Sequence, residues 1–157
     1  MSIAVKKLVS ALKKRKLKIS IAESCTGGLF SSTITSIAGS SKIFELGLVT
    51  YSNKSKINIL GIKKKILNKY GAVSEKTCLA MIKGLSKLNS ASIHVAITGI
   101  AGPSGHSKNK PIGLVFIGIK KDKNLIIKKC FFKNKGRLHI QNSAVSKSVK
   151  LILNLLK

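Results

Sequence analysis

One short stretch, Ile19–Gly28, constrains the fold of this chain more than any other. An apolar run with alternating hydrophobic residues ends at Glu23-Ser24, and a cysteine, a threonine and two glycines lead into a helical pattern over 29–38. The order is strand, tight polar turn, helix. Such a turn presents backbone N–H groups and hydroxyls at the start of a helix, where an anion or a developing oxyanion is stabilised. Taken alone, the same residues also fit a simple helix cap on Ser24 or Thr26.

Helix and strand patterns alternate along the rest of the chain, with no repeat and no linker between them. We expect helices over 2–14, 29–38, 54–60, 63–70, from Ser74 to Leu88 and from Arg137 to Leu156, and strands over 17–22, 44–51, 91–98, 112–120 and 124–132. The last helix is expected to bury Leu138, Val145, Val149, Ile152 and Leu156. This pattern predicts one domain over residues 1–157, a single three-layer α/β/α domain with a mixed β-sheet.

Length and composition are those of a globular protein. The chain has 157 residues, of which 44% are hydrophobic, and this is enough for a substantial core. No apolar run approaches the roughly 18–20 residues of a membrane span, and the basic N-terminus lacks the apolar core of a signal peptide. We therefore expect a cytoplasmic protein that has no membrane partner.

The three cysteines are too far apart in the sequence to suggest a metal site or a disulfide framework. They form no Cys-x-x-Cys pair, and no histidine lies at ligand spacing from any of them. Cys78 and Cys130 lie in apolar patterns and are expected in the core. Cys25 adjoins Ser24 and is an alternative nucleophile, although no histidine of the neighbouring motifs would activate it.

The net charge is unusual, because 30 basic residues stand against 4 acidic ones, for a formal charge of +26. An excess of this size first suggests nucleic acid. However, only two of the basic residues, Arg15 and Arg137, are arginines, and the lysines occur in nearly every predicted element. Aromatic residues do not alternate with them as stacking platforms would. These features favour compositional drift, and we expect no specific nucleic-acid partner.

Three polar clusters, 23–28, 50–56 and 98–103, each follow an apolar strand. In open α/β sheets ligands bind beyond the carboxyl ends of the strands, so the three clusters are expected to meet at one crevice. The first two clusters hold no histidine, and the chain has neither a Gly-x-Ser-x-Gly motif nor a phosphate-binding Gly-x-x-x-x-Gly-Lys-Ser/Thr loop. A serine nucleophile with a lysine base is the remaining chemistry.

These motifs resemble a known family. Glu-Ser-Cys-Thr-Gly-Gly, Val-Thr-Tyr-Ser-Asn-x-x-Lys, Gly-Ala-Val-Ser and Thr-Gly-Ile-Ala-Gly-Pro occur here in the order and spacing of the CinA C-terminal domain family, and the likeness runs from about Leu8 to the end of the last helix. The characterised activity of that family is nicotinamide mononucleotide amidohydrolase. The chain looks like a stand-alone form, without the molybdopterin-binding-like domain that often precedes this one.

The resemblance implies a role for each matching residue. Ser24 is the implied nucleophile and Lys56 the lysine that activates it. The product would be nicotinate mononucleotide with release of ammonia, in pyridine-nucleotide salvage, with no metal or cofactor and with a homo-oligomer as the common assembly. Near the start of the last helix the family has arginines that contact substrate; Arg137 does not clearly align with them, and Lys135 or His139 would occupy those positions. The residues implied to bind or support substrate are Tyr51, Thr98, Glu23, Thr26, Gly27, Gly28, Gly99, Gly102 and Lys135.

The chemistry requires a neutral lysine, because only the unprotonated amine takes a proton from serine. Burial and neighbouring cations both lower a lysine pKa from about 10.4. The N–H groups of the Cys25–Gly28 turn are candidate oxyanion donors, and the Gly99–Gly105 loop is a candidate phosphate site. The alternative is a catalytically inactive relative that binds nucleotides or nucleic acid through its basic surface.

Overall fold

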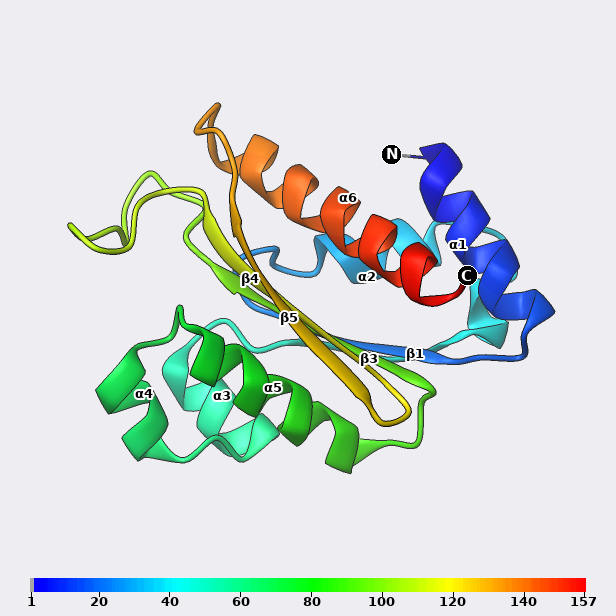
Figure 1. Cartoon of the computed structure of the whole chain (residues 1–157), viewed down its shortest axis with the longest axis horizontal. Helices are drawn as coiled ribbons and strands as arrows, with labels where there is room; N and C mark the ends of the chain where they lie inside the picture. Colours follow the sequence, from blue (N-terminus) through cyan, green and yellow to red (C-terminus); the bar gives the residue numbers. More distant parts are fainter. Residues whose placement is uncertain (1) are drawn as a thin grey trace.

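The computed structural model describes residues 2–157 and has one five-stranded mixed sheet at its centre. The strands are β1 (Ile19–Glu23), β2 (Phe44–Val49), β3 (Ile93–Gly99), β4 (Leu114–Lys121) and β5 (Asn124–Phe131), and their order across the sheet is β2-β1-β3-β4-β5 (Figure 1). β1 pairs in parallel with both β2 and β3, whereas β4 and β5 form an antiparallel hairpin at the other side.

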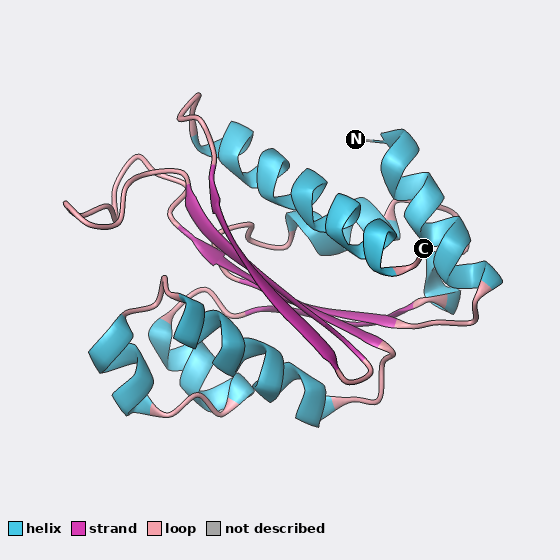
Figure 2. Cartoon of the chain, viewed as in Figure 1, coloured by secondary structure: helices cyan, strands magenta, loops and turns pink. Residues whose placement is uncertain are grey.

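Helices cover both faces of the sheet, as Figure 2 shows. On one face lie α1 (Ser2–Lys14), α2 (Leu29–Thr35) and α6 (Arg137–Leu155), and on the other lie α3 (Asn53–Leu60), α4 (Lys64–Tyr70) and α5 (Glu75–Leu88). A short 3₁₀ turn, Ser40–Lys42, precedes β2. Each helical layer buries its own hydrophobic cluster against the sheet. The predicted three-layer α/β/α fold is therefore confirmed.

Most element boundaries agree with the sequence patterns to within three residues, but one core residue was predicted wrongly. Leu138, expected on the buried face of α6, is 64% exposed. The buried stripe of α6 instead includes Ile140, Ala144 and Val145. Leu138 lies only about 20° around the helix axis from the buried Val145, seven residues later, so its angular position alone does not expose it. It is exposed because it stands in the first turn of α6, before the core cluster begins at Ile140. Cys78 and Cys130 are buried, as predicted.

The parallel pairing brings the three polar clusters together. Glu23, the last residue of β1, lies opposite Val49 of β2 and Ile97 of β3. Backbone hydrogen bonds continue past the strand ends: the Thr50 N–H donates to the Glu23 carbonyl at 2.8 Å, and the Ser24 N–H donates to the Ile97 carbonyl at 2.9 Å. The residues that follow β1, β2 and β3 thus leave the sheet at one edge, as the sequence predicts.

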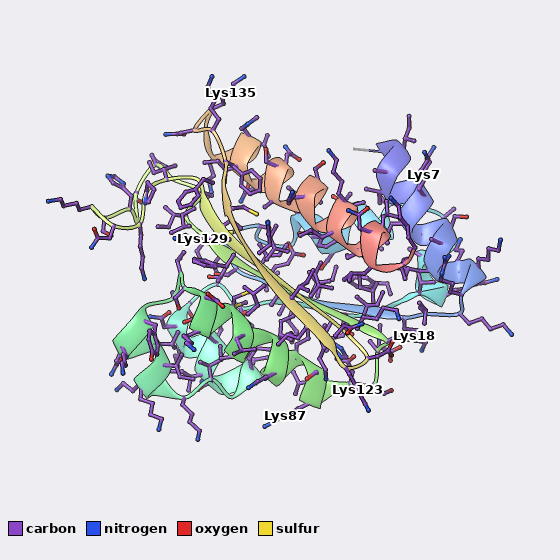
Figure 3. All side chains as sticks on the ribbon, viewed as in Figure 1. Lys7, Lys18, Lys87, Lys123, Lys129 and Lys135 are labelled. Carbon is purple, nitrogen blue, oxygen red and sulfur yellow. The ribbon has the colours of Figure 1, made fainter. Side chains whose placement is uncertain are left out.

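Exposed lysines occur on helices of both layers, on the β4–β5 hairpin and in the connecting loops. Figure 3 labels six of them, which come from both helical layers, from the hairpin and from loops: Lys7, Lys18, Lys87, Lys123, Lys129 and Lys135. The labelled lysines thus come from several different elements of the fold. Within residues 2–157, no helix has the length and apolar character that a membrane crossing requires.

Candidate active site

The turn after β1 holds Ser24 in a fixed position at the strand end. Two glycines end this turn, Gly27 with φ of +60° and Gly28 with φ of +95°, and α2 begins directly after them. Left-handed φ values disfavour residues with a Cβ. A Cβ on Gly27 would meet no atom within 4 Å, so backbone conformation rather than lack of space requires glycine there. The two glycines let the chain turn sharply between Ser24 and the start of α2 at Leu29.

Glu23 lies beneath this turn and supports it. Its carboxylate, which is fully buried, accepts hydrogen bonds from the backbone N–H groups of Gly28 (3.1 Å), Phe30 (3.1 Å) and Ser31 (2.8 Å), and from the Ser31 hydroxyl (2.7 Å). It therefore satisfies the N–H groups that a helix leaves unpaired at its start. Glu23 does not line the cavity described below, so its contacts make it a support of the turn rather than a substrate ligand.

Glu23→Gln is expected to lower the free energy of unfolding by about 2–4 kcal/mol, because an amide has one accepting oxygen where the carboxylate has two, and buried donors lose their partner. Urea denaturation measures the change. Glu45→Gln is the matched control, since Glu45 pairs with Lys18 on the surface and such pairs contribute about 1 kcal/mol or less. Equal losses in the two variants would contradict the role of Glu23.

Lys56 reaches Ser24 from α3. The helix is capped at its start by the Ser52 hydroxyl, and Lys56 is fully buried. Its Nζ lies 2.9 Å from Ser24 Oγ, 2.7 Å from the Thr50 carbonyl and 3.2 Å from the Tyr51 carbonyl. Burial lowers the pKa of Lys56 to about 8. In the neutral amine the two N–H groups donate to the two carbonyls, which leaves the lone pair for the Ser24 hydroxyl proton.

A cavity of about 280 Å³ opens above this pair. Its walls come from the turn after β1, the end of β2 with α3, the segment before α5, the loop after β3 and the start of α6. None of the lining residues is acidic; they are Ser24, Cys25, Tyr51, Lys56, Ala72, Val73, Thr98, Gly99, Ile100, Ala101, Gly102, Ser104, Gly105 and Arg137.

Four of the residues implied to bind substrate line this cavity: Tyr51, Thr98, Gly99 and Gly102. The Thr98 hydroxyl donates to the Ala72 carbonyl at 2.8 Å and so ties the segment before α5 to the end of β3. Thr26, Gly27 and Gly28 form the turn but do not line the cavity. Lys135 stands apart from it, at the outer end of the loop before α6 (Figure 3).

Arg137 is the cation at the cavity rim, rather than Lys135 or His139. Its Nη1 donates to the Gly102 carbonyl at 2.7 Å and its Nη2 to the Tyr51 hydroxyl at 2.6 Å. The resemblance left Arg137 without a clear partner in the family pattern. The loop after β5 has no regular periodicity, so sequence spacing did not show which cation of this region faces inward.

Cys25 lines the cavity but is poorly suited to nucleophilic attack. Burial raises the pKa of its thiol to about 12, so the reactive thiolate is disfavoured at neutral pH. Within residues 2–157, no group of three or more metal-ligating side chains gathers at one place. Of Ser24 and Cys25, Ser24 is the residue whose side chain contacts the buried lysine.

A serine and a buried lysine are therefore in contact at the carboxyl ends of parallel strands in a three-layer α/β/α sandwich. The family model described as the CinA C-terminal domain matches residues 2–156. The chain belongs to the CinA C-terminal domain family.

Curated relatives and crystal structures agree with this membership. A CinA-like protein of Prochlorococcus marinus (strain MIT 9301) is 48% identical over 151 residues, which are 93% of this chain and 36% of that protein. A CinA-like protein of Kosmotoga olearia is 48% identical over 122 residues, 78% of this chain and 30% of that protein. The chain thus spans about a third of the length of these relatives.

Two crystal structures show the same fold. The competence/damage inducible protein CihA from Agrobacterium tumefaciens superposes with a TM-score of 0.96 at 36% identity, covering 99% of this chain and 95% of that one. A CinA superfamily protein from Escherichia coli gives a TM-score of 0.88 at 30% identity, covering 96% of this chain and 90% of that one.

Proposed function

We propose that this chain is an amidohydrolase that converts nicotinamide mononucleotide into nicotinate mononucleotide and ammonia. The observation that carries the proposal is the contact of 2.9 Å between Ser24 Oγ and a fully buried Lys56 Nζ whose pKa is lowered to about 8. Membership of the CinA C-terminal domain family and its characterised activity supply the substrate.

The reaction runs in two halves. Neutral Lys56 takes the Ser24 proton while Oγ attacks the carboxamide carbon, and the tetrahedral intermediate then breaks its C–N bond as the lysine proton passes to the leaving nitrogen. Ammonia departs and an acyl ester remains on Ser24. Water then attacks this ester, with Lys56 again accepting a proton and returning it to Ser24 Oγ as the carboxylate product leaves.

The cavity suits an anionic nucleotide. Its lining has one guanidinium at the rim, Arg137, and no carboxylate. Among residues 2–157 the ion pairs are Lys18–Glu45 and Lys121–Asp122, so no carboxylate neutralises Arg137. A guanidinium binds phosphate through two parallel N–H bonds. We therefore assign the substrate phosphate to Arg137 and the adjoining Gly99–Gly105 loop.

The alternative function, nucleotide or nucleic-acid binding by an inactive relative, would depend on the basic surface instead of the cavity. Exposed lysines occur on helices of both layers and on the hairpin, so the charge is not confined to one element. This alternative predicts that the affinity for nucleotide or nucleic acid falls steeply as salt rises and that it does not change in Ser24→Ala.

Ammonia release from nicotinamide mononucleotide by the purified protein tests the proposal. We expect turnover by the parent protein, loss of turnover in Ser24→Ala with binding of the nucleotide retained, and unchanged turnover in Ser32→Ala, which alters an exposed serine of α2. A parent protein that releases no ammonia, or a Ser24→Ala variant that remains active, would refute it.

A further inference from the structure

We propose that Gln141 of α6 is a positioning residue that holds one of the two oxyanion donors in the turn after Ser24. The inference rests on the proposed function in that it takes Ser24 as the nucleophile. Gln141 lies outside the motifs that carry the family resemblance, and it does not line the cavity.

Only two backbone N–H groups of the turn remain available to an oxyanion. The Ser24 N–H donates to the Ile97 carbonyl, the Gly27 N–H to the Ser24 carbonyl at 3.1 Å, and the Gly28 N–H to Glu23 Oε2 at 3.1 Å. The N–H groups of Cys25 and Thr26 donate to no other residue within 2–157. The N–H of the residue after a serine nucleophile is a common oxyanion donor, and Cys25 lines the cavity, so the Cys25 N–H is in the expected place. Thr26 does not itself line the cavity, but its N–H is the next one along the turn and is unpaired within residues 2–157, and we take it as the second donor.

Each of these N–H groups is fixed by the carbonyl of its own peptide plane. A trans peptide is planar, and its C=O and N–H point in opposite directions, so a restrained carbonyl restrains the N–H. The Cys25 N–H shares a plane with the Ser24 carbonyl, which accepts from Gly27 inside the turn. The Thr26 N–H shares a plane with the Cys25 carbonyl, which accepts from Gln141 Nε2 at 2.8 Å.

The second donor is therefore held from outside the turn, across 116 residues of sequence. A carbonyl oxygen only accepts hydrogen bonds, so the Gln141 side chain must present its NH₂ group to it. Gln141 follows Arg137 by four residues and shares its face of α6. The buried residues Ile140 and Ala144 anchor this part of the helix in the core. One helix face thus supplies the rim cation and the support of the oxyanion turn.

Three variants test the contact. Gln141→Met keeps the length of the side chain without a donor, Gln141→Glu presents an acceptor, and Gln141→Lys restores an N–H donor. We expect kcat for nicotinamide mononucleotide to fall about tenfold in the methionine variant and further in the glutamate variant, with KM changed less than twofold. This is a part of the 10²–10³ that loss of a whole oxyanion donor costs. Gln141→Lys should return kcat to within threefold of the parent.

A second measurement separates this role from general support of the fold. The aldehyde analogue of the substrate, with a formyl group in place of the carboxamide, adds to Ser24: a bond forms between Oγ and the aldehyde carbon, the serine proton passes to Lys56, and the carbonyl oxygen becomes the oxyanion. Its affinity should fall in parallel with kcat, whereas affinity for nicotinate mononucleotide should stay constant. Asn142→Ala, a neighbouring change on α6, should leave both unchanged.

A kcat within twofold of the parent in Gln141→Met, or a raised KM at constant kcat, would overturn the inference. The outcome is distinguishable from failure of the proposed substrate. If the parent protein does not hydrolyse nicotinamide mononucleotide, the rate at which a fluorophosphonate labels Ser24 replaces kcat, because that reaction also develops charge on an oxygen above the turn. Slower labelling in Gln141→Met supports the inference, and equal labelling or an unlabelled parent overturns it.

Discussion

Lys56→Met is expected to lower kcat/KM for nicotinamide mononucleotide by at least about 10³-fold, because methionine fills the same space and cannot accept the Ser24 proton. In the parent protein the pKa of Lys56 is lowered to about 8 by burial. Its kcat/KM should therefore rise about tenfold per pH unit below pH 8 and level off above it. Initial rates of ammonia release between pH 6 and 10 measure both effects.

The same substitution should change how stability depends on pH. The folded-state pKa of about 8 lies below the ordinary value of 10.5, so protonating Lys56 opposes folding. The protonated lysine lowers the free energy of unfolding by the full amount below pH 8, and this loss disappears as the pH rises to 10.5. Methionine does not titrate, so the variant has no such loss. The free energy of unfolding of Lys56→Met minus that of the parent should thus be about 2–3 kcal/mol larger at pH 7 than at pH 10.

Lys54→Met is the matched control for both measurements, since Lys54 lies on the same helix and is exposed. It should leave the rate, its pH profile and the pH dependence of stability as they are in the parent. A pH-independent stability difference between Lys56→Met and the parent, or full activity in Lys56→Met, would remove Lys56 from the proposed mechanism.

Arg137→Ala is expected to raise KM for nicotinamide mononucleotide about 100-fold while kcat changes much less. The loss corresponds to about 3 kcal/mol, which is typical of a charge-assisted pair of hydrogen bonds to phosphate. Arg137→Lys should recover only part of it, because an ammonium group lacks the two-armed geometry. The nucleoside without its phosphate should show no difference between the parent and Arg137→Ala.

Lys135→Ala decides between the two cations of this region. Lys135 does not line the cavity, so its removal should leave KM within twofold of the parent. A rise in KM as large as that of Arg137→Ala would indicate that Lys135 binds the substrate phosphate. Equal effects of Arg137→Ala on the nucleotide and on the nucleoside would instead make Arg137 a support for Tyr51 and Gly102.

Several features of the fold were predictable because they depend on local patterns. Hydrophobic periodicity and caps identified the order of helices and strands, and the polar clusters at strand ends predicted a shared crevice. Leu138 shows the limit of such reasoning: it continues the apolar pattern of α6 but faces solvent, because the helix starts beyond the edge of the core cluster.

The sequence by itself determined the element order, the strand–turn–helix that carries Ser24, and the pairing of Ser24 with Lys56 through family motifs 32 positions apart. Only the tertiary structure decided that the Glu23 carboxylate caps α2, that Arg137 rather than Lys135 reaches the cavity, and that Gln141 contacts the turn. Local patterns specify which face of an element is buried. They carry no information on which polar side chain meets which backbone group across 116 residues, since that depends on how the layers pack.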